Sequence, residues 1–172
     1  QVTAISESSQ EARKFIPADI KIYNDYKSLI ASADIDVIFI SLPNQFASEA
    51  ACLSLQRGLH VFCEKPPART HAELLEVEKQ SLKFPELKLM YGFNHRFHLS
   101  VEEAKLLIDS NSLGRLINMK GVYGKSQMIS FNQTDWRTNR EASGGGILLD
   151  QGIHMLDLMR YLSGENFTEV FS

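Results

Sequence analysis

Several features that would assign this sequence to a large class of proteins are scarce or missing. Two cysteines, Cys52 and Cys63, occur among 172 residues, too few for a disulfide scaffold, and there are no paired Cys-x-x-Cys motifs to hold zinc. No apolar run reaches the roughly 18 residues that a membrane-spanning helix needs. The 18 Lys and Arg residues against 21 Asp and Glu residues give a net charge of −3, which excludes a generally basic surface for nucleic acid. We therefore expect a protein of a reducing, cytoplasmic compartment that binds neither nucleic acid nor membrane.

What is present is the composition of an ordinary globular protein. Hydrophobic residues make up 44% of the chain, enough for a substantial core. Because one domain takes roughly 100–200 residues, the chain amounts to one domain or parts of two. It begins at Gln1, directly before a strand-like run, and residues 167–172 form another such run. We expect an internal piece of a longer polypeptide.

The first half of the chain alternates short apolar runs with helix-like segments. The run Val37–Ser41 is continuously apolar apart from its last residue, which is typical of a strand buried on both faces. Strands separated by helices of this length pair in parallel, so the pattern predicts a doubly wound Rossmann-type sheet with its ligand site at the carboxyl ends of the strands. The expected strands are 2–6, 37–41, 60–63 and 88–93, and the expected helices are 9–15, 26–31, 44–57 and 70–83.

Three of the expected helices carry recognisable end signals. Asp25 is a suitable N-cap for the second helix, and Thr70 with Glu73 forms a capping-box pattern at the fourth. Gly58 follows the third helix at the position where a left-handed residue ends a helix. These signals fix the helix boundaries independently of the apolar pattern.

The second half of the chain changes character near Arg96, where the strand–helix alternation breaks. We therefore divide the chain into residues 1–95 and 96–172. The second part is expected to contain a helix over 100–110, a long strand over 116–123, a polar loop over 124–143 and an apolar helix over 147–162.

The sharpest local feature is the segment Cys63-Glu64-Lys65-Pro66-Pro67. A Glu–Lys pair directly after a buried strand lies where a doubly wound sheet binds its ligand, and the two prolines restrict the backbone that follows. Position alone leaves the interpretation open, since an exposed turn with a surface lysine fits the same letters.

A second cluster lies in the apolar helix, where Asp150, His154 and Asp157 follow the spacing i, i+4, i+7 that places side chains on one helical face. Burying a carboxylate and an imidazole costs several kcal/mol unless they are paired. A stripe exposed to water, a metal site and a general acid/base pair all remain open. His95 and His98 could be proposed as partners, but we expect them to pack or to face solvent.

Taken together, these segments resemble the Gfo/Idh/MocA (glucose–fructose oxidoreductase / inositol dehydrogenase) family of nicotinamide-dependent enzymes. The similarity runs over essentially the whole chain, and the order and intervals of the segments also fit. The matching segments are Ser41-Leu-Pro-Asn44, Gly58-Leu-His-Val-Phe-Cys-Glu-Lys-Pro66, Gly92-Phe-Asn-His-Arg-Phe97, Trp136-Arg137 and Gly144-Gly-Gly-Ile-Leu-Leu-Asp-Gln-Gly-Ile-His154.

The resemblance implies a Rossmann domain whose first strand–helix unit is missing here, followed by part of an α/β domain for substrate binding and oligomerisation. It implies hydride exchange between NAD or NADP and a hydroxyl or keto carbon of a sugar, cyclitol or nucleotide-sugar, without a metal, in a protein that forms a homo-oligomer (dimer or tetramer) when complete. The implied catalytic residues are Lys65 and the acid/base pair Asp150 and His154. The expected cofactor-binding positions are Glu7, Ser41, Leu42, Pro43, Asn44, Glu64, Lys65, Asn94, Trp136 and Arg137.

Two features depart from the family pattern. The Gly-rich phosphate loop belongs to the missing unit, so this piece alone would lack the pyrophosphate cradle. Ala47 stands where the family often has His. Glu7 favours NAD, because its charge would repel a 2′-phosphate, although neighbouring serines could still hydrogen-bond one.

Two other functions compete with a dehydrogenase. One is a non-catalytic relative that binds a dinucleotide and acts as a sensor or transcriptional co-regulator. The other is a metal-dependent hydrolase that uses Asp150, His154 and Asp157. Lys65 has no evident role in the hydrolase, and the presence of Lys65, Asp150 and His154 together favours the enzyme over the sensor.

Overall fold

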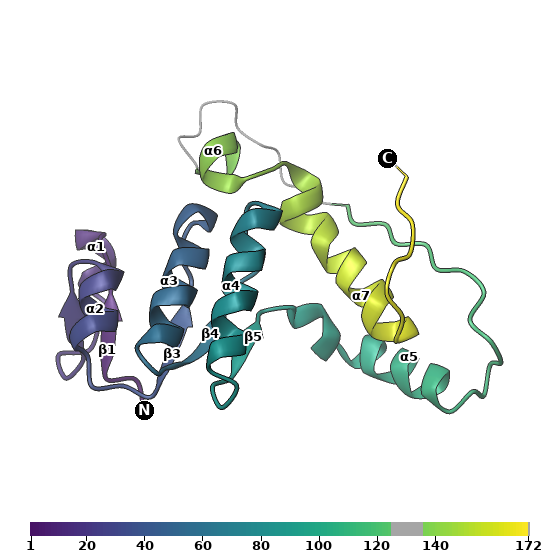
Figure 1. Ribbon diagram of the computed structural model, residues 1–172, viewed down its shortest axis with the longest axis horizontal. Helices are drawn as coiled ribbons and strands as arrows, with labels where there is room; N and C mark the ends of the chain where they lie inside the picture. Colours follow the sequence, from purple (N-terminus) through teal and green to yellow (C-terminus); the bar gives the residue numbers. More distant parts are fainter. Residues whose placement is uncertain (125–135, 172) are drawn as a thin grey trace. The chain divides into compact units, whose positions relative to one another are not determined.

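The computed structural model describes residues 1–124 and 136–171 of the chain. It divides into two compact units, Gln1–Tyr91 and Gly92–Ser172, and each is described by itself (Figure 1). The change of composition in the sequence places this division at residues 95/96.

The first unit contains five short parallel strands. Strand β1 (Ala4–Ser6) pairs with β2 (Lys21–Tyr23), and β3 (Val37–Ile40), β4 (His60–Cys63) and β5 (Leu89–Tyr91) form a second sheet in the order β3-β4-β5. All pairs are parallel, and helices connect successive strands of the second sheet. The predicted Rossmann-type fold is thereby confirmed.

Two helices of the first unit begin, and a third ends, where the sequence signals place them. Asp25 accepts a hydrogen bond from the backbone N–H of Ser28, and the hydroxyl of Thr70 accepts one from Glu73. Gly58 has a φ of 88°, in the left-handed region that favours glycine after a helix end. The four helices are α1 (Gln10–Arg13), α2 (Tyr26–Ser32), α3 (Asn44–Gln56) and α4 (His71–Lys83).

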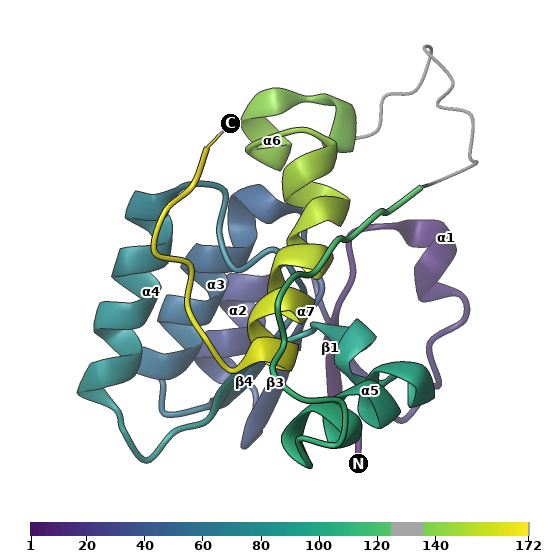
Figure 2. The ribbon, with the colours of Figure 1, turned by 90° about the vertical axis from the view of Figure 1, so that its right-hand side faces the viewer.

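The core of the first unit lies between the β3-β4-β5 sheet and the helices α2, α3 and α4, which lie side by side in both views (Figures 1 and 2). Ile38 and Ile40 of β3 are buried, but Val37 and Phe39 are 47% and 75% exposed. The prediction that this strand is buried on both faces is therefore wrong. The described residues supply helices for one face of the sheet, and Met90 of β5 is likewise 47% exposed.

The second unit is helical in its described residues. The strand predicted over 116–123 is not formed, and neither is the strand-like run over 167–171. A strand needs a hydrogen-bonding neighbour, and the described residues offer neither segment one. The elements are η1 (Asn94–Phe97), α5 (Leu99–Asp109), η2 (Trp136–Thr138), α6 (Arg140–Ser143), the π-helical turn η3 (Leu148–Gly152) and α7 (Ile153–Ser163).

The apolar segment over 147–162 forms η3 and α7 rather than one continuous α-helix. His154 is the buried residue of α7, whereas Ile147, Leu148 and Leu156 are 65%, 68% and 42% exposed. The apolar segment is therefore only partly buried, because the described residues cover only part of its surface.

Candidate active site

Polar residues of the first unit follow the carboxyl ends of β3 and β4. Ser41, Leu42 and Pro43 lead from β3 into α3, which begins at Asn44, a residue only 8% exposed. The backbone N–H of Glu64 donates to the carbonyl of Ile40 at 2.9 Å, so the two strand ends stay in register beyond the ladder. The predicted residues 41–44 and 64–65 therefore lie at the same edge of one sheet.

Lys65 sits on a tightly held stretch of backbone at this edge. It is partly buried, and Pro66, which follows it through a cis peptide bond, is fully buried. Its backbone N–H lies 3.3 Å from the carboxylate of Glu64, which is itself exposed. Cys63, one residue before Glu64, is buried at the end of β4, and this burial raises the pKa of its thiol to about 12.

Glu7 follows β1 and accepts hydrogen bonds from residues at the two ends of α1. Its carboxylate accepts a hydrogen bond from the backbone N–H of Ser9 at 2.7 Å, and its carbonyl accepts one from Nε of Arg13, also at 2.7 Å. The structure shows the helix-entry contact, which leaves the second carboxylate oxygen outside that hydrogen bond.

In the second unit, His154 is 5% exposed and lies within a group of aromatic rings. The imidazole of His95 stacks on it with ring centroids 4.0 Å apart and planes 12° apart, while Phe93 approaches it edge-on at 6.2 Å. Tyr123 stacks on His95 at 5.6 Å. His154 is thus held among the rings of His95 in η1, of Phe93 just before η1 and of Tyr123.

Tyr123 reaches this group because its segment runs close to α7 at Gly121. A Cβ atom at Gly121 would lie 3.1 Å from Cε of Met159 and 3.2 Å from Cβ of Met155. The glycine that interrupts the expected strand therefore permits close packing against the helix that carries His154.

Asp157 is paired with Arg96. Nε of Arg96 donates to Oδ2 of Asp157 at 2.8 Å, Nη2 donates to Oδ1, and the Asp157 side chain is 9% exposed. The hydrogen bonds from this guanidinium to Asp157 raise the pKa of Arg96. The burial of His154 and Asp157 shows that the predicted face is not a stripe exposed to water.

Asp150 lies in the π-helical turn η3, one element before His154. Nε2 of Gln151 donates to its Oδ2 at 2.9 Å. The glycine run 144–146 precedes this turn: Gly144, with a φ of 83°, ends α6, and the carbonyl of Gly146 accepts the first hydrogen bonds of the next helix. Such π-helical turns occur frequently at functional sites.

The remaining predicted contacts of the second unit lie in the short 3₁₀ helices. The guanidinium of Arg137 lies 4.5 Å from the ring centroid of Trp136, so these neighbours stack on each other in η2. Asn94 is the exposed first residue of η1.

Within residues 1–124 and 136–171, no group of three or more His, Cys, Asp and Glu residues is arranged to hold a metal ion. In the same ranges, no helix combines the length and the apolar composition of a membrane-spanning segment.

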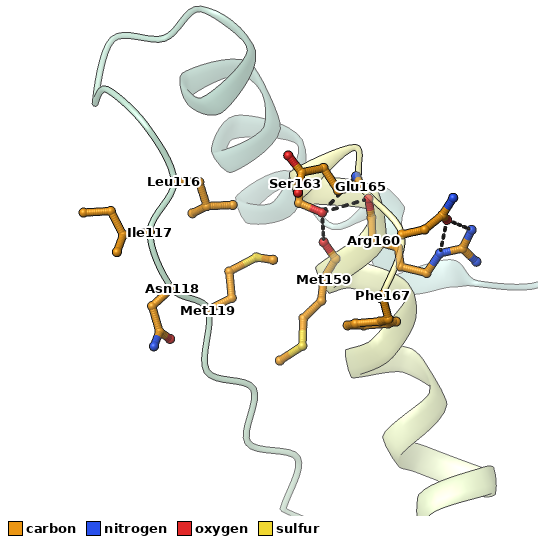
Figure 3. Close-up of a pocket in the computed structure, with 10 residues that line it drawn as sticks. Leu116, Ile117, Asn118, Met119, Met159, Arg160, Ser163, Glu165 and Phe167 are labelled. Atoms are coloured by element: carbon orange, nitrogen blue, oxygen red, sulfur yellow. Dashed lines mark hydrogen bonds between the residues drawn. The ribbon is translucent and has the colours of Figure 1, made fainter. Parts of the chain in front are cut away.

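A cavity of about 280 Å³ lies in the second unit between residues 116–119 and the end of α7 (Figure 3). Figure 3 shows Met119, Met159 and Phe167 at this cavity. The hydroxyl of Ser163 donates a hydrogen bond to the backbone carbonyl of Met159 in its own helix. None of the predicted site residues lines it.

The expectation that His95 packs or faces solvent is met by packing, but the sequence did not predict that its partner is His154, and it gave no place to Tyr123. His95 lies in the matching segment 92–97, but that segment does not indicate which residue it contacts, and Tyr123 lies in none of the matching segments. Their proximity to His154 depends on how η1 and the 116–124 segment fold against α7, which spacing along the chain does not reveal.

The parallel sheet with connecting helices, and the polar residues at its carboxyl edge, define a Rossmann-type nucleotide-binding domain. The profile of the oxidoreductase family with an NAD-binding Rossmann fold matches residues 1–92, and that of a GFO/IDH/MocA C-terminal domain matches residues 101–172. The chain belongs to the Gfo/Idh/MocA oxidoreductase family.

Two curated relatives illustrate the similarity. The levoglucosan dehydrogenase of Pseudarthrobacter phenanthrenivorans is 34% identical over 83% of this chain and 36% of its own length. The D-glucoside 3-dehydrogenase of Escherichia coli is 31% identical over 93% of this chain and 44% of its own length.

Solved structures agree with this assignment. Levoglucosan dehydrogenase in complex with NADH and levoglucosan is 30% identical, with a TM-score of 0.86 over 95% of this chain and 45% of that one. The myo-inositol 2-dehydrogenase of Lactobacillus plantarum is 29% identical, with a TM-score of 0.83 over 96% and 49%. The chain therefore spans less than half the length of these relatives.

Proposed function

We propose that the complete protein is an NAD(P)-dependent oxidoreductase that transfers hydride between a nicotinamide and a hydroxyl or keto carbon of a sugar or cyclitol. The observation that carries this proposal is the buried His154, held by stacked and edge-on rings in a chain whose relatives are named as dehydrogenases of levoglucosan, glucosides and inositol. A nucleotide-sugar is the further substrate class that the family resemblance allows.

In this proposal His154 is the general base. When hydride leaves carbon, the hydroxyl on that carbon must lose its proton, and imidazole is the side chain whose ordinary pKa lies closest to neutrality. Asp150 lies one helical turn earlier and would orient His154 or hold a second hydroxyl of the substrate. Asp157 has a structural role in this proposal, because both of its carboxylate oxygens accept hydrogen bonds from Arg96.

Lys65 supplies the positive charge. An ammonium beside the reacting oxygen stabilises the negative charge that develops as the proton leaves, and it can relay that proton. The buried Pro66 and the register bond between Glu64 and Ile40 support this assignment, because they fix the backbone on which Lys65 stands.

The first unit fits a dinucleotide at its carboxyl edge. Asn44 begins a 13-residue helix there and is 8% exposed, and the positive end of the helix dipole favours an anionic group such as a phosphate. The cofactor, when bound, supplies the hydride acceptor or donor. The residues proposed to hold it are Glu7, Ser41, Leu42, Pro43, Asn44, Glu64, Lys65, Asn94, Trp136 and Arg137.

The described strands of the first unit form two separate parallel sheets, β1-β2 and β3-β4-β5. We propose that a further strand of the complete polypeptide joins β1 to β3 and brings the Gly-rich phosphate loop that these residues lack. The exposed Phe39 and Val37 support this, because a helix following that strand would cover them.

NAD is the favoured cofactor over NADP in this proposal, because the Glu7 carboxylate would repel a 2′-phosphate. A cytoplasmic protein is supported by its two free cysteines, Cys52 and Cys63. A homo-oligomer, dimer or tetramer, is the assembly that the family resemblance favours.

The test is to follow the absorbance of reduced nicotinamide with the complete polypeptide, NAD or NADP, and a panel of sugars, cyclitols and nucleotide-sugars. Turnover of at least one of them supports the enzyme. Tight dinucleotide binding without turnover of any, together with capture of a protein partner, would instead establish the sensor. Retention of activity after chelation would set aside the metal-dependent hydrolase.

A further inference from the structure

We propose that His95 is a positioning residue for His154, and that the Arg96–Asp157 ion pair is the clasp that keeps it in place. The inference rests on the proposed function, in which His154 is the base. The imidazole of His95 stacks on that of His154, so its proposed part is to fix where the His154 imidazole points.

The contact between the two imidazoles is a face-to-face stack. With centroids 4.0 Å apart and planes 12° apart, rotation of the His154 ring about its Cβ–Cγ bond drives its edge into the face of His95. Phe93 limits the same ring from another side, with its plane at 88°. The ring of a general base must be aimed at the proton it removes, so this restriction bears on turnover.

His95 is itself enclosed. Tyr123 stacks on it with planes 11° apart, and His98 meets it edge-on at 5.3 Å. His95 therefore lies in a cluster of three nearly parallel rings, in which the centroid of Tyr123 is also 6.3 Å from that of His154. It cannot turn freely without displacing one of them.

The clasp fixes the element that carries His95. Arg96 is the next residue of η1, and its guanidinium holds Asp157, which stands three residues after His154 on α7. The same guanidinium lies 5.6 Å from the ring centroid of Phe93 and 5.2 Å from that of Tyr161. A bidentate ion pair between rings sets both the distance and the angle at which η1 meets α7.

The experiment compares His95→Ala with His95→Phe in the complete polypeptide. Phenylalanine keeps a flat face against His154, whereas alanine removes it. We expect His95→Ala to lower kcat about tenfold, since small misplacements of catalytic groups have effects of this size, with KM for the dinucleotide unchanged. His95→Phe should retain kcat within about threefold.

A spectroscopic readout separates orientation from folding. With nitrogen-15-labelled histidine, His154 should give one sharp set of ring signals in the parent and in His95→Phe, and shifted or broadened signals in His95→Ala. Arg96→Met should give the same change as His95→Ala, and Arg160→Met, the same substitution on α7 outside the clasp, should give none.

Unchanged kcat and unchanged His154 signals in His95→Ala would overturn the inference. A fall in kcat that phenylalanine fails to restore would also overturn it, because the face of the ring would then not be what matters. Full activity of His154→Asn would instead refute the proposed function, so the two failures are distinguishable.

Discussion

Arg96 and Asp157 join η1 to α7 through two hydrogen bonds from one guanidinium to one carboxylate. The Asp157 side chain is 9% exposed and that of Arg96 is 39% exposed, so the pair lies at the margin of the second unit rather than in open solvent. The Asp157 carboxylate is the more buried of the two groups, so it is the one that most needs the ion pair to offset the loss of its hydration.

The first prediction concerns stability. Arg96→Met leaves a nearly buried carboxylate without its guanidinium, and we expect a loss of about 1–3 kcal/mol, below the figure for a fully buried pair because Arg96 is partly exposed. Urea unfolding of the complete polypeptide measures it. Arg96→Met combined with Asp157→Leu should be more stable than Arg96→Met alone. A double variant less stable than the single one would show that the charge is not the cause.

The second prediction concerns the two proposed catalytic groups. His154→Ala and Lys65→Ala should each lower turnover by roughly 10² to 10⁴, because proton transfer or alkoxide stabilisation is lost. Affinity for the dinucleotide should fall only modestly. Lys79→Ala, an exposed lysine on α4, is the matched control. Near-normal turnover in both site variants would refute the assignment.

The third prediction concerns pH. Burial raises the pKa of Glu73, but hydrogen bonds from the Arg69 side chain and backbone outweigh it, and the net pKa lies below the ordinary value of 4.5. A carboxyl whose pKa is lowered by folding stabilises the protein above its unfolded pKa, and this contribution is lost as the pH falls through the folded value.

Glu73→Gln should therefore flatten the decline in unfolding free energy between about pH 5 and pH 3. Unfolding in urea at a series of pH values measures the slope. Glu78→Gln, an exposed position on the same helix, serves as control, and an equal flattening in both variants would contradict the role of the Arg69 contact.

The fourth prediction concerns the choice of dinucleotide. Glu7→Gln keeps an oxygen that can accept from the N–H of Ser9 but removes the negative charge, so kcat/KM with NADP should rise relative to NAD. Glu11→Gln, on the exposed side of α1, should leave that ratio unchanged. A constant ratio in Glu7→Gln would place the 2′ position of the cofactor away from Glu7.

Much of the first unit could be predicted because its signals are local. Asp25, Thr70 and Gly58 act on backbone groups within a few residues, and the run at β3 has the length and apolarity of a buried strand. Strand β2 was missed because it spans three residues, two of them exposed, and owes its conformation to pairing with β1.

Parts of the second unit could not be predicted, because their structure depends on contacts with residues far away in the sequence. Residues 116–123 have strand-like letters but find no hydrogen-bonding neighbour among the described residues, so they stay irregular. The face shared by His154 and Asp157 followed from helical spacing. The identity of their partners, His95 and Arg96, did not, because those residues come from η1.

The exposed face of β3 affects the solubility of this polypeptide. Phe39 touches Phe62 across the sheet, with centroids 5.2 Å apart, and otherwise meets solvent over three quarters of its surface. An exposed apolar patch of this kind favours aggregation. Substituting Phe39 by a lysine should reduce the aggregation of this polypeptide, whereas the same change in the complete polypeptide should lower its stability.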